Sequence, residues 1–172
     1  MDIQLDPLLQ EQLIIRIEKE IPKKMDEIIH LKIERIAKEF SIAQRDKKSP
    51  FRNVLAIANE SSASIEVIKN YIRYQVGRKG SSEVWKTSRD KKLFATAVVE
   101  QIEDLRQTAS DIVKDIRHSI PKGNELEIYL EDNQNRQQEE KRIHLKLAQL
   151  YLGYLAREHT AQVGENKVNQ NI

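Results

Sequence analysis

The sequence predicts an all-α protein, a bundle of five or six helices, and three observations carry this prediction. Glycine and proline are scarce, with 5 and 4 residues in 172, so the chain has few of the turn residues that an all-β fold needs. Its commonest residues are good helix formers such as Glu, Lys, Gln and Leu. Apolar residues also recur every three or four positions, which is the spacing of one helix face.

The N-terminal part of the chain predicts two helices. The first begins near Pro7, a residue that a first helical turn tolerates, and its apolar stripe consists of Leu9, Leu13, Ile17 and Ile21. Pro22 lacks an N–H, so we expect it to end or kink this helix. The second helix has the stripe Met25, Ile29, Ile33, Ile36 and Phe40. A polar run over residues 44–50 then breaks the pattern.

The middle of the chain predicts three more helices. A short one covers residues 51–59, and a serine-rich turn follows it, with Ser62 or Ser64 as the N-cap of the next. That helix runs from Ile65 until Gly77 or Gly80 ends it. The strongest periodic signal comes next, in the stripe Ala95, Val98, Ile102, Leu105, Ala109, Ile112 and Ile116. A stripe of this length must pack against partner helices along its whole course.

The C-terminal part combines a polar segment with an apolar helix. Residues 124–142 are polar and mostly acidic, so we expect a long mobile loop or an exposed helix near residues 122–142. From Ile143 the chain is apolar on most sides, which is typical of a central helix. We predict a single helical domain over residues 1–162, with an N-terminal extension (1–45), a core bundle (50–160) and a disordered tail (163–172).

Several classes of protein fit this sequence poorly. It has no cysteine, no Gly-rich phosphate loop and no nucleophile elbow, so we expect neither an enzyme nor a cofactor. Glu27 and His30, like Asp115 and His118, have the spacing of di-metal bundles, but both histidines lie off the apolar stripes and we predict no metal. No apolar run reaches the roughly 18–20 residues that span a bilayer, and we expect a cytoplasmic protein without membrane contact.

The distribution of charge is the most informative feature. Between Arg45 and Lys92 the chain has twelve basic residues and five acidic ones, with tyrosines interleaved at positions 71 and 74 and a tryptophan at 85. Basic side chains attract a phosphate backbone, and aromatic rings offer surfaces on which unpaired bases can stack. We therefore predict contact with RNA or another single strand. The alternative interpretation is that the lysines only keep the protein soluble and that Tyr71 and Trp85 are packed in the core.

Two stretches also resemble a known family. The segments FRNVLAIANESSASIEVIKNYIRYQVGR (51–78) and IHLKLAQLYLGYLAREHT (143–160) look like the small helical subunit of type III CRISPR effector complexes. The shared features are Ile72-Arg73-Tyr74-Gln75 and a helix ending in Tyr154-x-x-Arg157. The resemblance implies a non-catalytic subunit of a ribonucleoprotein for antiviral defence, which assembles with copies of itself and larger effector subunits. It also implies that basic residues of the chain line the channel for the guide–target duplex.

Together, the charge pattern and the resemblance define a set of predicted nucleic-acid-binding residues. The set consists of Lys69, Arg73, Tyr74, Arg78, Lys79, Lys86, Arg89 and Arg157. Two alternatives stay open. Segments 51–59 and 64–77 could form a helix-turn-helix of a DNA-binding regulator, with Lys69, Asn70 and Arg73 toward the bases. The chain could instead be a protein-interaction bundle whose basic face meets an acidic partner.

Overall fold

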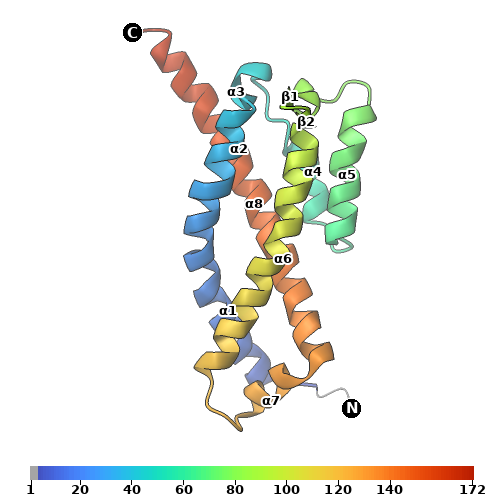
Figure 1. Ribbon diagram of the computed structural model, residues 1–172, viewed down its shortest axis with the longest axis vertical. Helices are drawn as coiled ribbons and strands as arrows, with labels where there is room; N and C mark the ends of the chain where they lie inside the picture. The colour runs from blue at the N-terminus through green and yellow to red at the C-terminus, as the bar shows by residue number, and fades with distance from the viewer. Residues whose placement is uncertain (1–3) are drawn as a thin grey trace. The chain divides into compact units, whose positions relative to one another are not determined.

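The computed structural model describes residues 4–172, and it confirms the all-α class (Figure 1). The N-terminal half contains α1 (Pro7–Ile28), the π-helical turn η1 (Ile29–Ile33), α2 (Glu34–Glu39), α3 (Ile42–Arg45), α4 (Arg52–Ala58) and α5 (Ile65–Gly77). After these come the 3₁₀ turn η2 (Glu83–Lys86), the two-residue strands β1 (Ser88–Arg89) and β2 (Lys92–Leu93), α6 (Phe94–Ser119), α7 (Glu125–Glu131) and α8 (Asn133–Asn169). The long stripe around residues 95–116 is thus the buried side of α6, as its period predicted.

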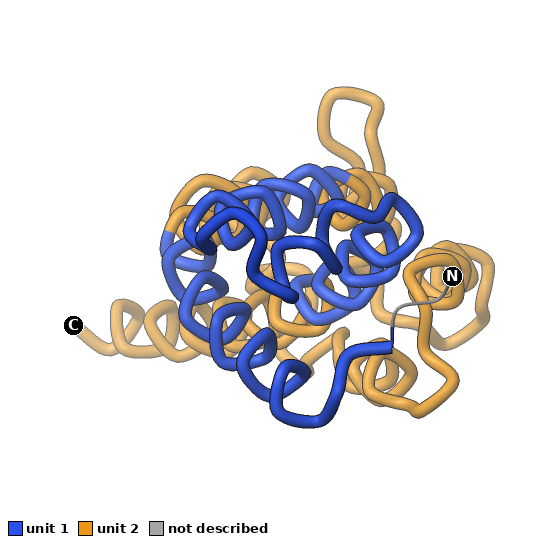
Figure 2. The backbone as a smooth tube through the Cα atoms, turned by 90° about the horizontal axis from the view of Figure 1, so that it is seen from below, with its two compact units in different colours: residues 1–26, 104–147 blue, residues 27–103, 148–172 orange. Residues whose placement is uncertain are grey.

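The chain divides into two compact units, which Figure 2 colours separately. Unit 1 consists of residues 1–26 and 104–147, and unit 2 of residues 27–103 and 148–172. The helices α6 and α8 contribute residues to both units, as does α1. These boundaries differ from the expected division into an extension that ends at residue 45 and a core that begins at residue 50.

Unit 2 has an aromatic core. The rings of Phe51, Trp85 and Phe94 are all fully buried, with centroids 5.4–6.2 Å apart in edge-on or tilted pairs. Phe40, which directly follows α2, adds to the cluster, with its ring centroid 5.5 Å from that of Phe94. Trp85 Nε1 donates a hydrogen bond to the Pro50 carbonyl at 3.3 Å, which satisfies the one polar atom of that ring. Elements from across unit 2 therefore meet around one cluster.

Local sequence sets the ends of the elements in unit 2. Ser64 caps α5, because its Oγ accepts a hydrogen bond from the Val67 N–H at 3.2 Å, so the second of the two predicted caps is confirmed. Gly80, just past α5, has φ +76°, which glycine adopts at low cost. The antiparallel β1–β2 hairpin pairs Ser88 with Leu93. Its turn residues, Asp90 and Lys91, have φ 47° and 66°, as tight hairpin turns require.

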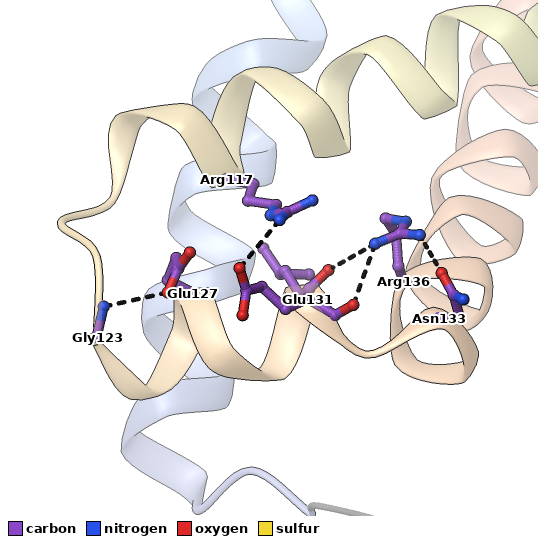
Figure 3. A network of polar contacts seen from close by, with 7 residues as sticks. Arg117, Gly123, Glu127, Glu131, Asn133 and Arg136 are labelled. Carbon is purple, nitrogen blue, oxygen red and sulfur yellow. Dashed lines mark hydrogen bonds and ion pairs between the residues drawn. The ribbon is translucent and has the colours of Figure 1, made fainter.

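In unit 1, the polar segment near residues 122–142 is mostly helical, so the exposed helix is the one of the two predicted alternatives that the structure has, and the mobile loop is not. Residues 125–131 form α7, with Leu126, Tyr129 and Leu130 buried, and residues 133–142 form the start of α8. Figure 3 shows the contacts that hold it. Arg117 donates to Glu131 at 3.2 Å, and Arg136 donates to the carbonyls at the end of α7. The Glu127 carboxylate accepts from the Gly123 N–H at 3.1 Å.

Two further expectations about helix ends are corrected. Of the two predicted effects of Pro22, an end or a kink, the end is wrong, since α1 continues to Ile28. Pro22 itself is exposed, and burying an aliphatic side chain such as Ile21 or Met25 contributes roughly 1.5–3 kcal/mol, which offsets a cost of about 3 kcal/mol for an interior proline. The expected disordered tail is also helical as far as Asn169, because α8 continues through it.

Candidate nucleic-acid interface

The predicted interface centres on α5 in unit 2. Ile68, Ile72 and Gln75 face the core of the unit, so the opposite side of the helix is left for solvent. That side presents Arg73 and Tyr74, the latter with 54% of its surface exposed. The Tyr74 ring lies 5.8 Å from the Tyr71 ring, centroid to centroid, and the two planes are tilted by 48°. An arginine and two neighbouring aromatic rings thus lie on adjoining turns of one helix.

Lys69, also on α5, differs from Arg73 because its charge is paired. Its Nζ donates to Glu103 of α6 at 2.9 Å and to Glu66 at 3.0 Å. These two hydrogen bonds, first that to Glu103 and then that to Glu66, raise the pKa of Lys69 above its ordinary value. Because one ammonium already faces two carboxylates, a phosphate would have to displace one of them. Lys69 ties α5 to α6 and is the least available of the predicted basic contacts.

The other predicted basic residues differ in how free their charges are. Within the described residues, Arg73, Arg78, Lys79 and Arg89 form no ion pair. Lys86 lies 3.8 Å from Glu83, a loose pair that is exposed on the Glu83 side. Arg157, on α8, is exposed, and its Cζ lies 5.2 Å from the centroid of the Tyr154 ring, a cation–π distance.

The hairpin after η2 continues the basic surface of the unit. Arg89 and Lys92 pair across it, and Lys91 is at its tip; all three are exposed. Lys92 forms an ion pair with Glu100 at 2.5 Å. Arg89 and Lys91 form no ion pair within the described residues.

The sequence suggested a helix cap from Thr87 to Asp90, but these residues belong to the hairpin and α6 begins only at Phe94, and Lys91 was left out of the predicted set. Asp90 and Lys91 adopt the left-handed conformation without the Asn-Gly or Asp-Gly sequence that usually signals a two-residue hairpin turn, so nothing in the sequence indicated this tip.

Trp85 is not part of the exposed surface. Its ring is fully buried in the aromatic cluster of unit 2, which confirms the alternative interpretation that Trp85 lies in the core. Tyr71 is half-buried beside Tyr74. The stacking surface offered by the middle of the chain therefore reduces to the Tyr71–Tyr74 pair on α5.

The histidines contribute no metal-binding cluster. His30 and His118 are exposed, and His30 Nδ1 lies 3.2 Å from the Glu34 carboxylate. His159 is buried, and its Nε2 donates to the Asp46 carbonyl at 2.8 Å, a structural role in unit 2. Among residues 4–172, no group of three or more His, Asp or Glu side chains is arranged to hold a metal ion. In the same range, no helix combines the length and the apolar character that a membrane span requires.

Comparison with known proteins gave no match, neither with a protein-family model nor with a curated protein or a solved structure.

Proposed function

We propose that the protein is a non-catalytic, nucleic-acid-binding subunit of a ribonucleoprotein and that unit 2 contacts single-stranded RNA. The observation that carries the proposal is that α5 exposes both Arg73, which forms no ion pair within the described residues, and Tyr74, whose ring pairs with the Tyr71 ring. A guanidinium binds phosphate with two parallel hydrogen bonds, and a ring beside it can stack on a base. The same helix thus offers a group that can bind phosphate and a ring on which a base can stack.

The charge of unit 2 supports the same proposal. The unit has 17 Lys and Arg residues against 12 Asp and Glu, whereas unit 1 has 12 against 15. A polyanion is therefore attracted to unit 2 in preference to unit 1. The resemblance of segments 51–78 and 143–160 to the small subunit of type III CRISPR complexes agrees with this proposal, because both segments contribute to unit 2.

Sequence-specific reading of duplex DNA is less well supported. In a helix-turn-helix the first residues of the second helix contact the base edges. Here the exposed residues at the start of α5 are Glu66 and Val67, and a carboxylate in that place repels phosphate. Lys69, the lysine expected to read bases, is held by Glu66 and Glu103.

The test is a titration of a short fluorescent RNA of mixed sequence, followed by anisotropy at several salt concentrations. The triple variant Arg73→Ala/Lys79→Ala/Arg89→Ala should reduce the slope of log K against log salt by about 2, since each lost phosphate contact on a single strand contributes about 0.7. Tyr74→Ala should weaken binding by about 1–3 kcal/mol and leave that slope unchanged, because stacking releases no counterions.

Lys114→Ala provides the matched control, because Lys114 is an exposed lysine of unit 1. It should bind RNA like the wild-type protein. Equal RNA binding by all four proteins would contradict the proposed interface. Preference for one duplex DNA sequence over RNA would favour the helix-turn-helix function, and absence of binding to either would favour a protein-interaction bundle.

A further inference from the structure

The connection between α3 and α4 in unit 2 is strongly basic, and it takes no part in the interface predicted from the sequence. From the last residue of α3 to the first residue of α4 it reads RDKKSPFR, and we call these residues, 45–52, the basic loop. Its four basic side chains are exposed, and none forms an ion pair within the described residues. They are Arg45, Lys47, Lys48 and Arg52.

The acidic groups around the basic loop do not neutralise it. Asp46 is its one acidic residue, and the Asp46 carboxylate accepts a hydrogen bond from the backbone N–H two residues further on, at 3.0 Å. Two other elements form hydrogen bonds with the loop, and each brings equal numbers of charges: η2 has Glu83 and Lys86, and α8 has Arg157 and Glu158 side by side. The loop therefore keeps its net charge of +3.

Contacts with the core of unit 2 hold the backbone of the basic loop in place. Near its start, His159 Nε2 of α8 donates a hydrogen bond to the Asp46 carbonyl at 2.8 Å. Near its end, Trp85 Nε1 of η2 donates to the Pro50 carbonyl at 3.3 Å, and the ring of Phe51 is fully buried in the aromatic cluster. Because this backbone is already ordered, a ligand that binds the loop loses little affinity to the cost of ordering it.

The basic loop adjoins residues that the sequence predicted to bind nucleic acid. Its Pro50 carbonyl is bonded to Trp85, and the next residue of η2 is Lys86, a member of the predicted set. Arg89, another member, follows in β1, where it is exposed. The loop's one aromatic ring, that of Phe51, is buried, so the loop offers cations and no stacking surface. Such a surface suits the phosphates of a strand and not its bases.

From these features we infer that the basic loop is a second phosphate-binding element, over which the backbone of a single strand bound at α5 continues. The inference rests on the proposed function and extends it to residues outside the predicted set. The four basic side chains bind phosphates and release counterions from them. Since the loop contacts neither the bases nor the ribose 2′-hydroxyls, it contributes equally to the binding of RNA and of single-stranded DNA.

The experiment measures anisotropy of the full chain with two labelled strands of about 16 nucleotides, one of uridine and one of deoxyuridine. Arg45→Ala/Lys47→Ala/Lys48→Ala should weaken the binding of both strands equally and reduce the slope of log K against log salt by about 2, at about 0.7 for each lost contact. Between about 50 and about 200 mM salt, the affinity of the wild-type chain should therefore fall roughly 20-fold more than that of the variant.

Lys114→Ala/Lys122→Ala/Lys141→Ala is the matched control, because it removes the same charge from three exposed lysines of unit 1 that form no ion pair within the described residues. It should keep the wild-type slope, and circular dichroism should show that both triple variants remain helical. An unchanged slope in the loop variant, or an equal reduction in the control, would overturn the inference.

The same measurements separate this inference from the proposed function. If Tyr74→Ala weakened binding and the loop variant did not, the α5 interface would stand and the basic loop would be excluded. If the wild-type chain bound neither strand, both proposals would fail. A loss confined to the uridine strand would show contact with the 2′-hydroxyl and would also overturn the inference. Tight binding of a poly-glutamate peptide, weakened to the same extent by the loop variant, would assign the loop to an acidic protein instead.

Discussion

The two units of this protein differ in the residues that form their cores and in the sign of their net charge. Unit 2 packs Phe51, Trp85 and Phe94 into an aromatic core and has an excess of basic residues. Unit 1 contains an excess of acidic residues, buries carboxylates at Glu127 and Glu139, and leaves aliphatic residues of α1 exposed. The formal charge of +2 hides this division because it averages the two. Unit 2 has a net charge of +5 and unit 1 a net charge of −3.

The difference also concerns what stabilises each unit. Contacts between rings in unit 2 do not depend on protonation, so they resist changes of pH and respond to lost volume. In unit 1, Glu139 accepts hydrogen bonds from the Tyr129 hydroxyl at 2.9 Å and from Arg142 at 3.2 Å while its side chain is 5% exposed. Such a network depends on the charge of its members and responds to pH. A mutation that removes core volume should therefore destabilise unit 2 more than unit 1. A change of pH should destabilise unit 1 more than unit 2.

The largest effect should come from Trp85→Ala in unit 2. This change removes the largest fully buried side chain and leaves a cavity beside Phe51 and Phe94, so we expect a loss of about 3–5 kcal/mol in the free energy of unfolding. Denaturant unfolding followed by circular dichroism measures it. Ile128→Ala in unit 1 is the control and should change this free energy by no more than about 0.5 kcal/mol. A loss below about 1 kcal/mol for Trp85→Ala would refute the aromatic core as the main stabilising feature.

A smaller effect, specific to unit 1, should follow from Tyr129→Phe. Near neutral pH the variant loses the hydrogen bond to Glu139, which costs about 1.5–3 kcal/mol because the acceptor is charged. Burial, aided by the hydrogen bond to Glu139, raises the pKa of Tyr129 to about 12. The folded state thus holds this proton more tightly than the unfolded state, in which tyrosine titrates near 10.

The sign of the pH dependence follows from these two pKa values. The stability that neutral Tyr129 contributes is complete below pH 10 and is lost as the pH rises from about 10 to about 12. The difference in unfolding free energy between wild type and Tyr129→Phe should therefore shrink over that interval, measured by denaturant titrations at a series of pH values. Tyr151, whose pKa is also raised by burial, is present in both proteins and cancels in the difference. A difference that stays constant to pH 12 would contradict the buried hydrogen bond.

The sequence was informative about the fold where apolar residues repeat without interruption. The long stripe of α6 and the Ser64 cap of α5 follow from local rules, since both depend on neighbours within a few residues. The order of segment 122–142 could not be predicted in this way. It depends on contacts such as Arg117 with Glu131, fourteen residues apart, and Ser110 with Glu140, thirty residues apart. Polar composition alone therefore could not decide between the loop and the exposed helix.

The candidate interface shows the same limit. Residue type and spacing placed Lys69 and Arg73 one turn apart on one face of α5, because helical periodicity settles that relation. Spacing could not show that Lys69 pairs with Glu103, which is thirty-four residues away on another helix, or that Trp85 is buried. Whether a basic or aromatic side chain is exposed and unpaired depends on tertiary contacts. Such contacts join residues far apart in the chain, and the spacing of residues in a single sequence does not predict them.

The smallest effect should come from the buried donors that each unit leaves unpaired. Gln75 in unit 2 and Asn135 in unit 1 are 3% and 7% exposed, and the side-chain nitrogen of each has no hydrogen-bond partner within the described residues. Gln75→Met preserves the shape of the side chain and removes the unsatisfied group, so its effect on the unfolding free energy should lie between zero and about 1 kcal/mol of added stability. Asn135→Leu should be equally harmless to folding, because it too removes an unsatisfied donor and nearly preserves the volume of the side chain. Parallel denaturant titrations compare both variants with the wild-type chain. A loss of more than about 2 kcal/mol in either variant would show that its amide makes a hydrogen bond that the fold needs, and would contradict the prediction.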